Sequence, residues 1–489
     1  MTIVPSGLST YQDPPAQLGH QDADMLGKLL RVWEQKRPRN VLRSVYYDGK
    51  QPFKDFGIAV PDRLQEFDQT LEWPAKGVSA LVDRSNLEGF VAPGMTDDPF
   101  DIEGILADNN FYAEFPMAVQ SSAIHACSFL TVSQGDVAAG EPEILILPRA
   151  ADASAGLWDK RRRGVRGFLS VIDADDDGQP TDLVMYLPDK TVLLTAANGR
   201  LHVSTRPNPL DEVPVAPLVH KPDLKRPFGK SRITRSAMYY TDAALRTIVR
   251  SEIHAEGFAG PQYWIMGASA KSVVGNDRFK AVMGRVFGMT ENKDTGDIPD
   301  VKRFDSSSPQ PHTEHLRMWA TMFAGDQGMA VSSLGVVQDN PSSAEAIYAA
   351  KEDLITDARM FNKSLGFGAA KAVRMAVRMR DGMSDTPDEL RKLSAMFTDP
   401  SMTSPTAAAD AFTKRASVIP GFAESEVGLE SAGLTREQIV RFRDEQRRNS
   451  AGSALQNLLA AAGNRSNAAE GTTEPTGPNV EVDSDADEG

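Results

Sequence analysis

Two long helical patterns with a segment of different character between them constrain the fold of this chain most strongly. Apolar residues recur at helical spacing over Ser231–Glu256, and again from His312 to about Met329. Between them, a strand-like stretch at Gln262–Met266 leads into residues 267–311, which mix Gly, Asp, Ser and Lys with short apolar runs. This order predicts two long helices that flank a compact mixed segment.

The segments before this region predict both helices and strands. Helical periodicity begins near Asp22 and ends before Pro38, and further amphipathic segments follow Pro61 and span Pro74–Arg84. From Ala118 to Leu201 the pattern changes to short β-type runs with turn residues between them, at Phe129–Val132, Glu143–Leu147, Gly167–Ile172, Asp182–Leu187 and Lys190–Thr195. These runs predict an antiparallel meander in a chain that mixes helices and strands.

The longest helical pattern runs from Ser343 to about Arg380. It opens with Ser342-Ser343-Ala344-Glu345, a capping box in which Ser342 and Glu345 are the capping residues. Gly366 and Gly368 are positions where this helix could bend. A last helical section covers 406–462 with a break at 419–428, and residues 464–489 lack apolar periodicity, which predicts disorder.

Charge and composition exclude several classes of protein. The net charge is −14; removing the seven acidic residues between 470 and 488 leaves 60 acidic against 53 basic residues, or −7. A protein that binds nucleic acid by neutralising phosphates needs a concentrated basic surface instead. No apolar run approaches the ~20 residues of a membrane span, and the N-terminus lacks a secretory pattern. The one cysteine, Cys127, lies in an apolar run and is expected to be buried and inert.

Gly229-Lys230-Ser231, at the start of a helical pattern, is similar to the end of a phosphate-binding loop. That loop needs a glycine five positions before its last one, where this chain has Leu224, and Pro227 removes a backbone donor. Ser231 as a helix N-cap explains the residues better. The nucleotide-using enzyme nevertheless stays the alternative function.

Three other patterns favour ordinary structure over chemistry. Asp173–Gly178 matches half of a calcium loop, but Val184 stands where its bidentate glutamate belongs, so a hairpin turn is favoured. His312 and His315 have metal-ligand spacing without an evident third ligand, and the basic run 160–163 is expected to be solvated surface. The sequence therefore predicts no catalytic residue, metal site or cofactor.

Six segments occur in an order that resembles the portal proteins of tailed bacteriophages, in particular those of actinobacterial phages. They are Tyr46–Gly49 with Phe56–Pro61, Trp73–Phe90, Val213–Val219 with Phe228–Ser231 and Thr241–Ala244, Phe258–Gln262, Asn340–Ile347, and Phe397–Pro400 with Ala409–Ala411. Each segment alone is a weak signal, but six in order over 46–415 are specific.

The resemblance implies a ring-forming α+β fold with wing, helical stem, α/β clip and helical crown. Residues 1–228 would form the N-terminal arm and wing, 229–258 and 311–332 the two stem helices, 259–310 the clip, 333–400 the channel loop, long helix and wing return, 401–463 the crown, and 464–489 a disordered acidic tail. Gly366-Phe367-Gly368 departs from a regular long helix.

The resemblance also implies a function that needs no bond-breaking by this chain. A ring of usually twelve subunits at one capsid vertex would pass double-stranded DNA without sequence specificity during packaging and ejection. Its partners would be the large terminase, the head–tail adaptor, and the major capsid and scaffold proteins. The location would be the virion, after assembly in the host cytoplasm, with no membrane partner.

Three groups of residues are expected to carry this function. The channel loop is assigned to Ser332, Ser333, Gly335, Gln338, Asp339 and Asn340. The subunit interface is assigned to Leu245, Ile248, Met318 and Phe323. Docking of the motor and adaptor is assigned to the basic clip residues Lys271, Arg278, Lys280 and Arg285.

Overall fold

The computed structural model describes residues 18–54, 69–92, 98, 100–175, 180–197, 200–258, 263–266, 296, 300–303, 308–336, 344–401 and 405–469. The chain divides into two compact units, 1–400 and 401–489. Mixed helices and sheets make up unit 1, and helices make up the described part of unit 2.

Two antiparallel sheets form the centre of unit 1. The three-stranded sheet has the order β3 (Ile144–Ala150), β2 (Cys127–Gln134), β9 (Val215–Val219). The five-stranded sheet follows chain order through β4 (Ser154–Asp159), β5 (Gly164–Ala174), β6 (Pro180–Tyr186), β7 (Lys190–Ala197) and β8 (Arg200–Pro207). The predicted meander is thus confirmed for its last three runs, whereas the first two belong to the other sheet, and β4 and β8 were not predicted.

Small two-stranded sheets and short elements complete unit 1. Strand β1 (Leu87–Val91) pairs with β12 (Ser394–Phe397), and β10 (Tyr263–Met266) pairs with β11 (Asp300–Arg303). The remaining short elements are α4 (Ile102–Asp108), α11 (Asp388–Arg391), and the 3-10 turns η2 (Val137–Ala139) and η3 (Val331–Leu334).

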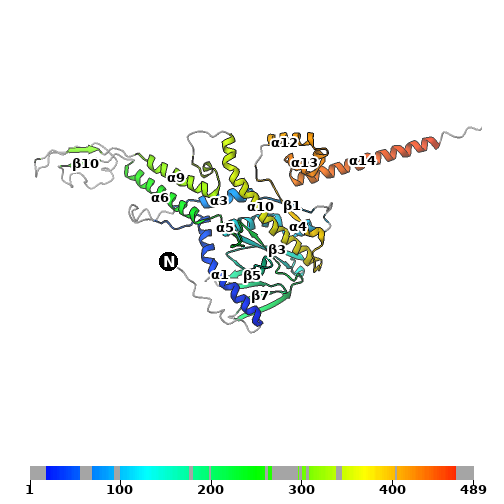
Figure 1. The fold of residues 1–489 in the computed structure, drawn as a ribbon, viewed down its shortest axis with the longest axis horizontal. Coiled ribbons are helices and arrows are strands. Elements are labelled where there is room, and N and C mark those ends of the chain that lie inside the picture. Colours follow the sequence, from blue (N-terminus) through cyan, green and yellow to red (C-terminus); the bar gives the residue numbers. More distant parts are fainter. Residues whose placement is uncertain are drawn as a thin grey trace, which may run out of the picture. The chain divides into compact units, whose positions relative to one another are not determined.

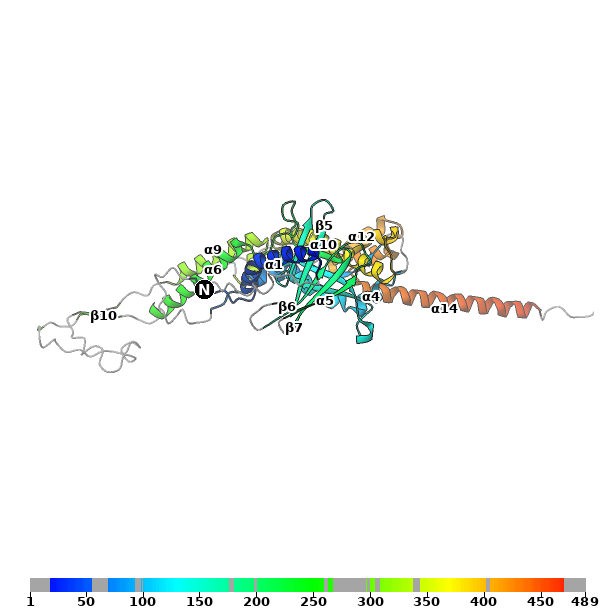
Figure 2. The same ribbon diagram turned by 90° about the horizontal axis from the view of Figure 1, so that it is seen from below.

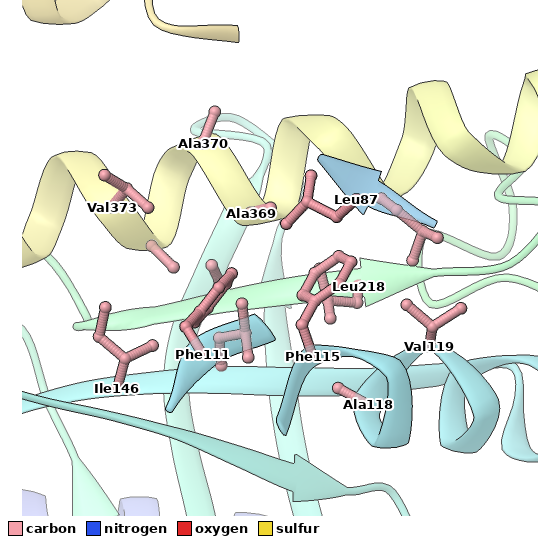
Figure 3. Packing of buried hydrophobic residues seen from close by; sticks show 14 of the residues in the cluster. Leu87, Phe111, Phe115, Ala118, Val119, Ile146, Leu218, Ala369, Ala370 and Val373 are labelled. Carbon is pink, nitrogen blue, oxygen red and sulfur yellow. The ribbon is translucent and has the colours of Figure 1, made fainter. Parts of the chain in front are cut away.

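The main core lies where α5 (Phe111–His125) and α10 (Ala344–Arg380) enclose apolar side chains together with the three-stranded sheet. Phe111 and Phe115 of α5 point toward the helix that carries Ala369 and Val373 (Figure 3), and their rings stack with centroids 5.4 Å apart. Leu218 of β9 is also fully buried here. This packing explains why α10 is long, apolar on one face and central to unit 1.

Gly366 and Gly368 do not interrupt α10, which continues through both as one helix. A Cβ atom on Gly368 would lie 2.5 Å from the carbonyl oxygen of Pro217 and 2.7 Å from Leu218 Cδ2. The glycine therefore allows the helix to approach strand β9 closely. A Cβ atom on Gly366 would make only ordinary contact, 3.4 Å from the Phe397 ring.

Helix α1 (His20–Tyr47) contradicts the predicted end before Pro38, because it continues through the proline. Pro38 costs one backbone hydrogen bond, but both sides of it are anchored to the start of the five-stranded sheet. Trp33 Nε1 donates to the Asp152 carbonyl at 2.7 Å, and Asn40 Nδ2 donates to the Ala151 carbonyl at 2.9 Å. Tertiary contacts thus override the local signal.

The expected start of β structure at Ala118 is also wrong, because α5 extends to His125. Phe111, Phe115, Ala118 and Ser122 are buried along one face, which is helical spacing. The helix ends at Ala126, whose φ of 92° is incompatible with a right-handed helix, and β2 begins at the next residue.

The predicted helices elsewhere are confirmed with small changes at their ends. They are α3 (Trp73–Val82), α6 (Arg235–Phe258) and α9 (Gln310–Gln327) in unit 1. Unit 2 contains α12 (Pro405–Val418), η4 (Phe422–Glu424), α13 (Glu426–Ser431) and α14 (Arg436–Ala469). The predicted break at 419–428 is present, while α14 runs past the expected helix end at 462. The segment after Pro61 and residues 470–489 lie outside the described residues.

Candidate assembly site at the helical stem

Helices α6 and α9, called the stem from here on, lie side by side (Figures 1 and 2). Small buried side chains let them approach closely, namely Ala237 and Ala244 of α6 and Ala320 and Ala324 of α9. Phe323 of α9 is fully buried against Trp73 of α3, with ring centroids 5.5 Å apart. The stem therefore packs on α3 through an apolar cluster of its own.

Both helices of the stem expose large apolar side chains. Tyr239 of α6 is 54% exposed, and Met318 and Met322, one turn apart on α9, are 38% and 46% exposed. Trp319 joins the two helices, because its ring lies 6.0 Å from that of Tyr239. We call Tyr239, Met318 and Met322 the stem stripe. Apolar surface of this kind marks an interaction site more often than an isolated exposed residue does.

The structure divides the four residues assigned to the subunit interface. Leu245 and Phe323 are buried within the chain itself, at 2% and 0% exposure, so they belong to the packing of the subunit. Met318 is exposed and Ile248 is half-buried. Met322 and Tyr239 were not predicted, although Met322 follows Met318 at helical spacing and could have been found from the sequence.

A buried arginine ties the stem to the rest of unit 1. Arg232 is 4% exposed, and its Nε donates to the Gly77 carbonyl of α3 at 2.7 Å. Its NH2 group donates to the Gln327 carbonyl at the end of α9 at 2.6 Å. A third nitrogen lies 3.5 Å from the Asp357 carboxylate of α10. One guanidinium thus connects α3, α9 and α10 directly before α6 begins.

The surroundings of Arg232 are charged and tightly packed. Burial lowers the pKa of its guanidinium, whereas the neighbouring Asp357 carboxylate raises it. Asp357 also pairs with Lys221 at 2.7 Å. A Cβ atom on Gly77 would lie 2.9 Å from Gln327 Oε1, so only glycine lets α3 reach the end of α9 without a shift.

A second polar cluster holds α6 against the end of α1. The Tyr46 hydroxyl donates to the Asp242 carboxylate at 2.9 Å, and Lys54 Nζ lies 2.7 Å from the same carboxylate. Lys54 Nζ also donates to the Tyr46 hydroxyl at 2.6 Å. Burial raises the pKa of Tyr46, which keeps it a neutral donor. The stem is therefore fixed at two places along α6.

The described part of the expected channel loop folds back on the stem. Ser332 and Ser333 are exposed on η3, and Gly335 ends this turn with a φ of 78°. Val331, Leu334 and Val336 pack against the cluster that contains Trp73 and Phe323. Gln338, Asp339 and Asn340 lie outside the described residues, as do the capping-box residues Ser342 and Ser343.

The four basic residues assigned to docking, Lys271, Arg278, Lys280 and Arg285, also lie outside the described residues. Within 259–310, the strand expected at Gln262–Met266 is present as β10, which pairs with β11. The docking assignment therefore stays a prediction.

Gly229-Lys230-Ser231 forms a structural turn whose polar groups are occupied. Ser231 is buried, donates its hydroxyl to the Ile124 carbonyl and accepts from the Ile233 amide. Lys230 Nζ pairs with Asp223 at 3.1 Å, and its amide donates to the His220 carbonyl. The predicted N-cap is wrong, because α6 begins four residues later and Thr234 Oγ1 accepts from the Ala237 amide. Nothing in this geometry favours nucleotide binding.

The remaining candidate motifs are ordinary parts of the fold. Strands β5 and β6 pair up to Ala174 and Pro180, so the hairpin expected around Asp173 is confirmed. The His254 ring lies 5.1 Å from that of His312 across the stem, but no group of three or more metal ligands occurs among the described residues. Cys127 is buried in β2, which raises the pKa of its thiol to about 12.

Within the described part of the chain, no helix is long and apolar enough to cross a membrane.

Comparisons with known proteins identify the class. Residues 27–451 match the family model for the phage portal protein, SPP1 Gp6-like. The chain therefore belongs to the SPP1 Gp6-like family of phage portal proteins, which confirms the resemblance carried by the six segments. This family is structural, and its members are components of the virion.

Individual relatives agree with this assignment. The chain is 25% identical over 460 residues to the portal protein of Mycobacterium phage L5, covering 92% of this chain and 90% of the relative. It is also 25% identical over 433 residues to the portal protein of Mycobacterium phage D29, covering 86% of this chain and 88% of the relative.

Among solved structures, the neck of a native GTA particle computed with C12 symmetry aligns with a TM-score of 0.43 at 13% identity. The alignment covers 81% of this chain and 93% of that one. The neck of an empty GTA particle computed with C6 symmetry aligns with a TM-score of 0.42 at 11% identity, over 81% and 93% of the two chains.

Proposed function

We propose that this chain assembles into a closed ring at one capsid vertex, through which double-stranded DNA is packaged and ejected. The stem stripe carries this proposal beyond family membership. It leaves Tyr239, Met318 and Met322 in solvent on two helices that pack on each other and on α3 through buried apolar side chains. In a ring, each subunit can cover this face with a different face of its neighbour, so the contacts close on themselves.

The proposal extends to the other parts of the chain. The clip (259–310) carries the docking surface for the terminase motor and the head–tail adaptor, and the wing meets capsid and scaffold proteins. The loop 332–340 narrows the bore. The body of the chain carries a net charge of −7, which repels DNA phosphates and favours sliding over binding.

Replacing Met318 and Met322 together with lysine tests the ring. Two ammonium groups buried against a neighbouring subunit cost several kcal/mol at every contact, so Met318→Lys/Met322→Lys should remain monomeric. Light scattering and electron microscopy of the wild-type chain should show an assembly of about a dozen subunits. Thr313→Lys, an exposed position on the same helix, is the matched control and should assemble normally.

Two results would contradict the proposal. A wild-type chain that stays monomeric at high concentration excludes the ring itself. Intact rings of the double lysine variant show that the stem stripe is not the contact. A reconstruction of the wild-type ring tests the remaining placements, because loop 332–340 must then line the bore and residues 259–310 must lie at the outer end of the stem.

A further inference from the structure

The turn between strands β4 and β5 concentrates positive charge in a chain that is acidic as a whole. Residues 156–168 contain five cations and one carboxylate, a net charge of +4, whereas the whole chain carries −14. All five cationic side chains are exposed. We call them the basic hairpin, and they are Lys160, Arg161, Arg162, Arg163 and Arg166.

The one carboxylate of this turn is bound to the backbone. Asp159 Oδ1 accepts from the Arg161 amide at 2.8 Å and from the Arg162 amide at 3.0 Å. These two hydrogen bonds lower the pKa of Asp159, so the carboxylate stays ionised and holds the turn.

The cations of the basic hairpin have no such partner. In the described part of the chain none of the five forms an ion pair, whereas Lys54, Lys221 and Arg359 do. Five positive charges therefore remain available to an anion from outside the chain.

The backbone that presents these charges is firmly held. Strands β4 and β5 pair as far as Asp159 and Gly164, directly beside the turn. The Trp158 ring packs against the Phe228 ring with centroids 5.6 Å apart, which ties the hairpin to the segment that precedes the stem. Cations on a preformed turn lose less conformational entropy on binding than cations on a loose loop.

The composition of the turn indicates which class of anion it fits. A protein partner normally requires an apolar centre in the contact surface, but residues 159–166 expose no large apolar side chain, and Val165 is half-buried. Surfaces that bind DNA are more polar and much more positive. Four of the five cations are arginines, whose planar guanidinium groups bind phosphates through two hydrogen bonds.

The acidic character of the whole chain does not oppose this contact strongly. Charges farther away than about 10 Å are largely screened at 0.1 M salt. The local charge of +4 within residues 156–168 therefore decides what binds at the turn.

We propose that the basic hairpin binds the phosphate backbone of double-stranded DNA, without sequence specificity, at a site on the five-stranded sheet. The site goes beyond the proposed function, in which DNA passes the ring without being held. In a ring every subunit presents one basic hairpin, so weak contacts of several subunits with one duplex reinforce each other.

Filter binding of a closed circular DNA duplex to the full-length chain tests this site. A closed circle cannot thread through a preformed ring, so its retention reports on surfaces outside the channel. Each phosphate neutralised contributes about 0.9 to the slope of log affinity against log salt, so five cations give a slope of about −4.5. Raising the salt from about 50 to 200 mM should then weaken binding about 500-fold.

Neutralising three cations should remove most of this salt dependence. Arg161→Gln/Arg162→Gln/Arg166→Gln retains Arg163, whose φ of 54° completes the turn. Two cations remain, so the slope should fall to about −1.8 and the same salt step should weaken binding only about 12-fold. If several hairpins of a ring bind one circle, both slopes grow together and their ratio is kept.

The matched control removes the same charge elsewhere in unit 1. Arg359→Gln/Lys363→Gln/Lys392→Gln replaces three exposed cations and should retain the wild-type slope. An equal loss of slope in this control would overturn the site, because binding would then follow the total charge of the chain. A wild-type slope in the hairpin variant would show that the basic hairpin is only solvated surface.

The wild-type chain alone can also refute the site. If it does not retain DNA at about 50 mM salt, the basic hairpin does not bind duplex DNA, and an acidic protein becomes the class of partner to test. A chain that stays monomeric contradicts the proposed ring but still presents its hairpin, so the slopes test the DNA site separately from the proposed function.

Discussion

Arg232 is the residue at which the stem meets α3 and α10, and replacing it with methionine tests how firmly the stem is attached. Methionine fills similar volume but removes the donors to the Gly77 and Gln327 carbonyls, which lie 2.7 and 2.6 Å away. The Gln327 carbonyl, at the end of α9, is then left without a partner, which costs about 1–3 kcal/mol. The Gly77 carbonyl lies inside α3 and keeps the helical hydrogen bond from the Leu81 amide, so its loss is only about 1 kcal/mol. Asp357 adds little, because Lys221 still pairs with it. The expected loss of stability is therefore about 2–4 kcal/mol.

Urea unfolding at low protein concentration, followed by tryptophan fluorescence, measures this loss without a contribution from assembly. Trp73 and Trp319 report on the region directly, since both belong to the apolar cluster of the stem. The control is Arg359→Met on α10. Its ion pair with Asp399 has side chains 52% and 64% exposed, so this substitution should cost less than about 1 kcal/mol.

Comparing Arg232→Met with Arg359→Met can refute the role given to the buried hydrogen bonds. If Arg232→Met costs no more than Arg359→Met, the buried hydrogen bonds do not hold the stem, and the apolar contact of Phe323 with Trp73 must do so alone. Arg232→Lys refines the test, because lysine keeps the charge but cannot reach both carbonyls in the planar geometry of arginine. The free energy of unfolding of Arg232→Lys should lie between those of the wild type and of Arg232→Met.

Three further substitutions test packing and pH dependence in unit 1. Gly368→Ala should lose about 1–3 kcal/mol in urea unfolding, because its Cβ meets the Pro217 carbonyl oxygen. Gly366→Ala should be neutral or gain up to about 1 kcal/mol, and equal effects of the two would contradict the close approach to β9. Burial lowers the pKa of His220 to about 4 from its ordinary 6.5, so the unfolded chain takes up a proton first as the pH falls. Stability is then lost between pH 6.5 and 4, by about 2 kcal/mol from pH 7 to 5. His220→Gln should remove that part of the pH dependence, and an unchanged slope would refute it.

The sequence predicts the helices better than the sheets, for physical reasons. A long helix carries its own periodic signal over many residues, so α6, α9 and α10 were predicted, with errors at their ends and in the bends expected at Gly366 and Gly368 of α10. Assigning β2 and β3 to the meander failed because short apolar runs do not reveal their partners. Strand β2 pairs with β9, which lies about 80 residues further along the chain. The distance along the chain hides that sheet from any local pattern.

Local signals failed where distant contacts act on the backbone. Pro38 would end an isolated helix, but hydrogen bonds from Trp33 and Asn40 to residues more than 100 positions away hold α1 on both sides of it. The two glycines of α10 were interpreted as bends because glycine has a low helix propensity and no neighbour in the sequence explains its presence. The reason for Gly368 is the carbonyl of Pro217, which only the folded structure brings near.

The attachment of the stem was missed for a similar reason. Arg232 donates to two main-chain carbonyls, 155 and 95 positions away along the chain. A main-chain acceptor leaves no side-chain signal at Gly77 or Gln327, so no residue pattern announces the contact. In contrast, the stem stripe has a partial signal in the spacing of Met318 and Met322. Surface residues on one helix can therefore be predicted from sequence, whereas the buried links between elements cannot.

The difference between the two units bears on the order of assembly. Unit 1 holds a continuous core around α5 and α10 and fixes its stem through Arg232 and Asp242, so a single subunit can present a preformed stem stripe. Unit 2 has only Leu429 and Ile439 buried among its described side chains. A contact that must itself be ordered by binding costs more free energy than one between rigid surfaces. In the proposed ring, we therefore expect the contacts of unit 1 to form first, because they join surfaces that are already ordered.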